Sequence, residues 1–137
     1  MVRAKKRISP GGTARILIAE DHALMRAGLR AILSRNSRWK VCGEGVNGKE
    51  AVEKVQELRP DLAVLGISMP MMNGIEAARE IRRIAPATKI LFLTEQEPSQ
   101  IEDAVRQAGT DAIVKKTVTA TSFTKAVKRL LDRHCRY

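Results

Sequence analysis

Five short apolar runs, each followed by a segment with helical periodicity, constrain the fold of this chain more than any other feature. The runs cover residues 16–19, 41–43, 62–66, 89–94 and 112–114. Between and after them, apolar residues recur every three or four positions, as on a helix with one buried face. Strands that alternate with helices in this way build a parallel sheet with helices on both faces.

The segments between the strands carry helix boundary signals. Asp21 is expected to cap a first helix, whose apolar stripe is predicted to comprise Leu24, Met25, Gly28, Leu29, Ile32 and Leu33. A second helix is predicted from Asn47 to the Arg59-Pro60 step. Further helices are expected over 74–85, over 98–108 with Gly109 as the stop, and from about 121 onwards. Right-handed crossovers then favour a doubly wound, flavodoxin-like α/β fold with strand order 2-1-3-4-5.

Length and composition indicate one folded unit. With 137 residues, 44% of them hydrophobic, the chain suits a single domain, which we expect over 15–134 with no output domain after it. Residues 1–14 are predicted to be a basic flexible arm, because Ser9-Pro10-Gly11-Gly12 interrupts regular structure. We expect no membrane span and no secretory signal. The chain has two cysteines, and they lack the spacing of metal ligands. So few cysteines favour a reducing compartment, the cytoplasm.

The net charge of +10 is concentrated at the two ends of the chain. Residues 1–15 hold five cations and no acid, and residues 115–137 hold seven cations and one acid. Such ends attract nucleic acid, anionic lipid or an acidic protein, but they are also typical of a solubilising tail and a solvated helix face.

Candidate site residues stand at the ends of four of the predicted strands. Glu20 and Asp21 follow the first strand, Gly66 closes the third, Thr94 closes the fourth, and Lys115-Lys116 follow the fifth. In a doubly wound sheet, ligands bind at the carboxyl ends of the strands, so we expect these residues to meet. Paired carboxylates suit Mg²⁺, and a hydroxyl with an ammonium suits phosphoryl oxygens. Each signal alone is more typical of a helix cap or a solvated lysine.

Taken together, these segments resemble the receiver domain of bacterial two-component response regulators. Residues 15–22 (RILIAEDH) are similar to its first strand and acidic pair, and 22–29 (HALMRAGL) to the first helix of LuxR/NarL-type receivers. Residues 60–77 (PDLAVLGISMPMMNGIEA) resemble the phosphoacceptor strand and the helix after it. Thr94 matches the switch hydroxyl, and 108–116 (AGTDAIVKK) matches the segment that ends in the family's lysine, here Lys116.

The resemblance implies a degenerate site. Gly66 stands where the family carries the aspartate that accepts a phosphoryl group, and glycine has no nucleophile. The expected Mg²⁺ ligands are Glu20, Asp21 and the carbonyl of Ser68, and without the acceptor carboxylate Mg²⁺ should bind weakly, if at all. The ammonium of Lys116 could then pair with Glu20 or Asp21 and hold one conformation. Ile113 replaces an aromatic residue common in the family.

These expectations describe a pseudo-receiver in phosphorelay signalling that is not an enzyme and acts through protein contacts. Its partner would be a histidine kinase, another receiver or an output protein. The predicted partner surface is basic and comprises Lys115, Lys125, Lys128, Arg129 and Arg133. One alternative is a small basic nucleic-acid-binding protein that uses its two basic ends, although Trp39 and Tyr137 are isolated in the sequence. The other is an ordinary receiver inactivated by a recent or engineered Asp-to-Gly change.

Overall fold

The computed structural model describes residues 12–135, except the side chains of residues 98–102 and 133–135. The predicted arm therefore lies largely outside the described residues. Strands and helices alternate along the chain in the order β1 (Ala14–Ala19), α1 (Ala23–Leu33), β2 (Trp39–Gly45), α2 (Gly48–Leu58), β3 (Leu62–Gly66), α3 (Gly74–Ile84), β4 (Lys89–Thr94), α4 (Pro98–Ala108), β5 (Ala112–Lys115) and α5 (Ala120–Cys135).

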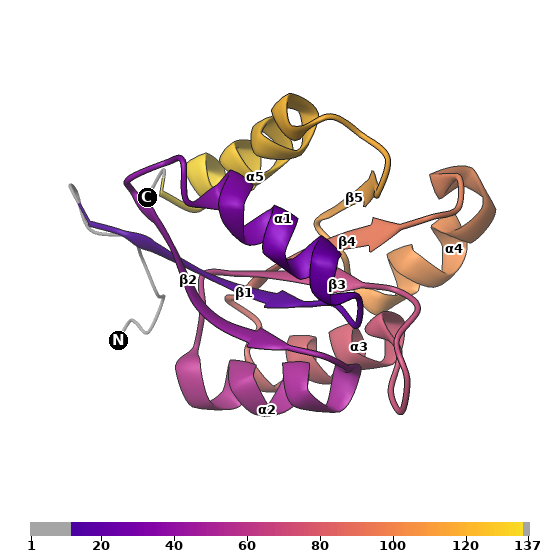
Figure 1. The fold of residues 1–137 in the computed structure, drawn as a ribbon. Helices are drawn as coiled ribbons and strands as arrows, with labels where there is room; N and C mark the ends of the chain where they lie inside the picture. Colours follow the sequence, from indigo (N-terminus) through magenta and orange to yellow (C-terminus); the bar gives the residue numbers. More distant parts are fainter. Residues whose placement is uncertain (1–11, 136–137) are drawn as a thin grey trace.

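The five strands form one parallel sheet in the order β2-β1-β3-β4-β5. Helices α1 and α5 cover one face, and α2, α3 and α4 cover the other (Figure 1). The predicted doubly wound fold and strand order are confirmed. No helix in the described part of the chain is long and apolar enough to cross a membrane.

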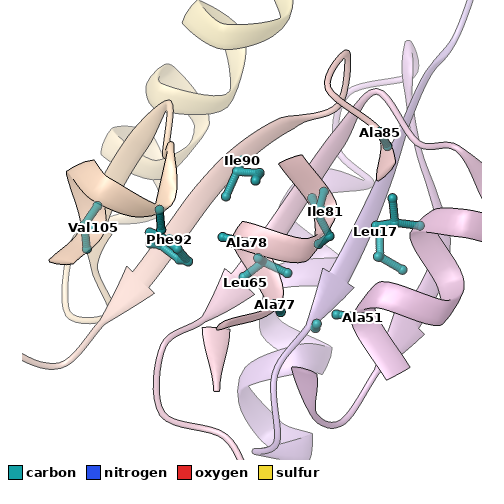
Figure 2. Close-up of a cluster of buried hydrophobic side chains, with 14 residues drawn as sticks. Leu17, Ala51, Leu65, Ala77, Ala78, Ile81, Ala85, Ile90, Phe92 and Val105 are labelled. Atoms are coloured by element: carbon teal, nitrogen blue, oxygen red, sulfur yellow. The ribbon is translucent and has the colours of Figure 1, made fainter. Parts of the chain in front are cut away.

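Two hydrophobic cores lie on opposite sides of the sheet, and strand β3 contributes to both. Ala63 and Leu65 point into the core under α2, α3 and α4, which is shown in Figure 2. Leu62 and Val64 point into the core under α1 and α5. All four are fully buried, because a central parallel strand has both faces covered. The apolar run at 62–66 therefore indicates a strand at the centre of the sheet.

Helix ends follow the boundary signals at most places. Asn47 caps α2 by accepting a hydrogen bond from the Glu50 N–H at 2.8 Å. Asn73 and Glu76 form a reciprocal capping box at the start of α3. Gly109 ends α4 with φ 82°, in the left-handed region that glycine enters most easily.

The start of α1 differs from its prediction. The N-cap is His22, not Asp21, and no side chain caps the helix. Leu24, predicted to face the core, is 87% exposed, whereas Leu29 and Leu33 are buried. Leu24 precedes Leu29 by five positions and so lies about 140° away around the helix, outside the buried stripe.

Strand boundaries differ at the sheet edge. Strand β2 runs over Trp39–Gly45 and not only 41–43, because a strand that pairs on one side alone needs no continuous apolar run. Ala14, predicted as the last residue of the arm, pairs with Trp39 in the sheet. Hence β1 begins one residue before the predicted domain boundary.

Candidate functional site

Strand order places the ends of β1, β3, β4 and β5 side by side, so the predicted polar residues converge. Beyond these ends lies a hollow of about 140 Å³ whose polar lining includes His22, Ser68, Thr94 and Lys116. The hollow is the candidate site at the carboxyl edge of the sheet. Its walls come from four separate loops, each fixed by the strand that precedes it.

Gly66 ends β3 beneath the side chain of Glu20. A Cβ atom at position 66 would lie 2.5 Å from Glu20 Oε1, closer than real Cβ contacts. The Glu20 carboxylate therefore fills the space that any side chain of residue 66 would enter. Glu20 itself is fully buried.

The buried Glu20 carboxylate has partners at both oxygens. Its Oε1 lies 3.0 Å from Nζ of Lys116, which is itself only 8% exposed. Its Oε2 accepts a hydrogen bond from the His22 N–H at 3.1 Å and lies 2.7 Å from His22 Nδ1. Such pairing is what a buried charge requires, since an unpaired carboxylate in the interior is strongly destabilising.

Thr94 and Lys116 lie on adjacent strand ends. The Thr94 carbonyl accepts a hydrogen bond from the Lys116 N–H at 2.8 Å, which ties β4 to the segment after β5. The buried Thr94 Oγ1 accepts from the Gln96 N–H at 3.0 Å. Both side chains line the same hollow, as expected for a pair that contacts phosphoryl oxygens.

One group of His and carboxylate side chains among the described residues is compact enough for a metal ion. Glu20, Asp21 and His22 each offer one ligand atom, and these atoms lie within 4.8 Å of one another. Ser68, the third predicted Mg²⁺ ligand, lines the hollow and is exposed. His22 has no role that the sequence predicts; the one signal for it is its position directly after the acidic pair.

The structure separates the members of the predicted basic surface. Lys115 pairs with Glu97 at 2.6 Å on the β5 side. Lys125 and Lys128 instead line a hollow that α5 shares with the end of α1. Arg129 is exposed on α5, and the side chain of Arg133 lies outside the described residues.

Comparisons with known proteins agree with this arrangement. The model of the response regulator receiver domain family matches residues 16–128. The response regulator protein VraR of Staphylococcus aureus is 38% identical over 121 residues, which cover 85% of this chain and 56% of VraR. The chain thus spans little more than half the length of this curated relative.

Solved structures are similar over almost the whole fold. A LuxR-family two-component response regulator from an Aurantimonas species superimposes with a TM-score of 0.84 at 30% identity, covering 90% of this chain and 88% of the other. The receiver domain of the putative response regulator NarL from Mycobacterium tuberculosis gives a TM-score of 0.84 at 29% identity, covering 88% and 98%.

Proposed function

The chain belongs to the response regulator receiver family, and from that premise we propose that it is a receiver module of two-component signalling that works without phosphorylation. Its strand β3 ends in Gly66 at the place where the resemblance puts the acceptor aspartate. We further propose that it has no catalytic turnover and acts by contact with a protein partner.

The observation that carries this proposal is the position of Glu20. Its carboxylate lies over Gly66 and pairs with Lys116 at 3.0 Å. In a phosphorylatable site, the lysine ammonium must be available to the incoming phosphoryl oxygens. Here the ammonium is neutralised by a group from the protein itself, so the pocket has its charge balance without phosphate.

The same geometry supports weak Mg²⁺ binding. Glu20, Asp21 and the carbonyl of Ser68 would hold the ion, and His22 adds a nitrogen at the same place. A cation would have to compete with Lys116 for Glu20 Oε1 and with His22 for Oε2. Fewer free carboxylate oxygens lower the affinity of a site for a hard divalent cation.

The partner is proposed to be a histidine kinase, another receiver or an output protein. Of the predicted partner surface, Arg129 on α5 is exposed and would face an acidic patch on that partner, whereas Lys115 on β5 is half-buried and paired with Glu97. Because exposed charges steer association more than they determine affinity, substitutions there should mainly lower the association rate.

Phosphorylation can be tested directly by intact-mass analysis after incubation with acetyl phosphate and Mg²⁺. The chain is compared with its Gly66→Asp and Gly66→Asn variants, which intrude equally on Glu20 but differ in the presence of a nucleophile. We expect a phosphoryl adduct only in Gly66→Asp, because the end of the Glu20 side chain can rotate away.

A phosphoryl adduct on the unaltered chain would refute the proposal, because another residue would then have taken over as acceptor. If all three proteins stay unmodified, Lys116 or the metal ligands no longer support the reaction. The phosphorylation-independent module then stands, but its pocket has lost more than the acceptor.

A further inference from the structure

A basic groove lies between the end of α1, the following loop and α5, away from the receiver pocket. It has a volume of about 610 Å³. Its charged lining residues are Arg35, Lys125 and Lys128, and within the described part of the chain its lining contains no Asp or Glu. Asp132, one turn beyond Lys128 on α5, is exposed and does not line the groove.

The remaining lining residues add two further kinds of contact. Trp39 contributes an aromatic side chain that is half-buried, packed on the core beneath α1 and α5 while also lining the groove. Ser37, Thr121 and Thr124 contribute hydroxyl groups. Cations and hydroxyls contact phosphates, and an aromatic face stacks with a base.

We propose that this groove binds single-stranded nucleic acid, with phosphates on Arg35, Lys125 and Lys128 and a base against Trp39. Acidic residues alone would pair with the cations, whereas a nucleotide strand supplies both the phosphates for the cations and a base for the indole. The groove volume of about 610 Å³ lies in the range of pockets for small molecules, about 300–1,000 Å³. A groove of this size can admit a few nucleotides of a flexible single strand at a time. It is too small for the broad surface of a duplex.

The chain provides its own probe, because Trp39 is the only tryptophan. The full chain is titrated with an oligothymidylate of about 16 nucleotides, the upper end of typical single-strand sites. Stacking of a thymine on the indole is expected to quench Trp39 emission. The salt dependence of the affinity counts the phosphate contacts, with a log–log slope of about −0.7 per contact.

Two matched double variants test the location. Lys125→Glu/Lys128→Glu changes the groove, whereas Lys49→Glu/Arg79→Glu makes the same change in charge at exposed positions on α2 and α3, across the sheet. At about 0.1 M salt, where charges more than about 10 Å apart are screened, we expect the groove variant to bind roughly tenfold more weakly or worse. Its salt slope should fall by about 1.4. The control should lose less than about threefold.

Two further measurements distinguish the groove from an acidic-protein site and from the basic N-terminal residues. Polyglutamate should bind weakly and leave Trp39 emission unchanged. Lys5→Glu/Lys6→Glu, at positions outside the described residues, should leave the Trp39 quenching in place. Circular dichroism of each variant checks that the fold is intact.

Three results would overturn the proposal. The first is equal affinity of the groove variant and the control. The second is saturable binding of the oligonucleotide with no change in Trp39 emission. The third is polyglutamate binding as tightly as the oligonucleotide, which would assign the groove to an acidic protein. Failure of the groove proposal would not bear on the proposed loss of phosphorylation, because that proposal rests on Gly66 and is tested separately by intact-mass analysis.

Discussion

Replacing Lys116 with methionine should destabilise the protein far more than any exposed charge substitution. The change keeps most of the aliphatic stem but removes the ammonium 3.0 Å from Glu20 Oε1. Glu20 is fully buried, so its carboxylate would lose the lysine partner that the segment after β5 supplies. Breaking a buried ion pair from one side costs about 3–5 kcal/mol. Because the His22 N–H still donates to Oε2 at 3.1 Å, we expect about 3 kcal/mol, at the low end of that range.

The neighbouring lysine is a matched control. Lys115 also pairs with a glutamate, Glu97, at the shorter distance of 2.6 Å, but Glu97 is 61% exposed. Exposed pairs contribute about 0–1 kcal/mol, so Lys115→Met should change the free energy of unfolding by less than about 1 kcal/mol. Burial, not distance, is the variable that separates the two lysines.

Urea unfolding, followed by circular dichroism, measures these changes as shifts in the transition midpoint at constant slope. A double-mutant cycle with Glu20→Gln isolates the pair, since the double variant leaves no buried charge. We expect a coupling energy of about 2 kcal/mol, so that the double variant is more stable than the sum of the single changes predicts. If Lys116→Met costs no more than Lys115→Met, or if the coupling is near zero, the Glu20–Lys116 pair does not balance the pocket.

Three further predictions follow from other contacts. Gly48→Ala should cost about 2–4 kcal/mol in urea unfolding, because its Cβ would lie 2.2 Å from the Met72 carbonyl oxygen; Gly28→Ala, with nothing within 4 Å, should instead stabilise α1 by about 0.5–1 kcal/mol. A hydrogen bond from Arg83 lowers the pKa of Glu80 below its ordinary 4.5. The small stabilisation from this pair is therefore present above pH 4.5 and is lost as the pH falls through the lowered pKa. In a carbon NMR titration, Arg83→Gln should raise the Glu80 pKa, and an unchanged titration would contradict the pairing. Burial raises the pKa of the Cys42 thiol. Iodoacetamide should therefore modify Cys42 slowly at neutral pH and much faster in urea, as measured by mass spectrometry. Equal rates of modification in the two conditions would show that burial does not protect the thiol.

The fold could be predicted from the sequence because its strongest signals come from buried elements. The runs at 62–66 and 89–94 match β3 and β4 to the residue, since these central strands are apolar on both faces. Edge strand β2 was predicted too short for the opposite reason. Leu24 was placed in the core because helical spacing alone does not say where the buried stripe ends.

The site could be predicted in position but not in detail. Strand order brings Glu20, Thr94 and Lys116 together, and that order follows from the pattern of runs. Which carboxylate oxygen lies above Gly66 depends on a side-chain rotamer, for which the sequence has no signal. The groove beside Trp39 depends on residues about 90 positions apart meeting across two helices, so its aromatic residue looked isolated.

The contribution of β3 to both cores has a consequence for how such a protein can change over generations. Leu62 to Leu65 place side chains in both cores, as β1 and β4 also do, whereas Gly66 at the end of the same strand adds no side chain to either core. A side chain at position 66 would displace only the end of the Glu20 side chain, whereas a polar residue at any of the four positions before it would be buried in one of the two cores. In a scaffold built in this way, the residue that ends β3 can change while the fold is kept. The surface of that fold then remains available for the selection of new protein contacts.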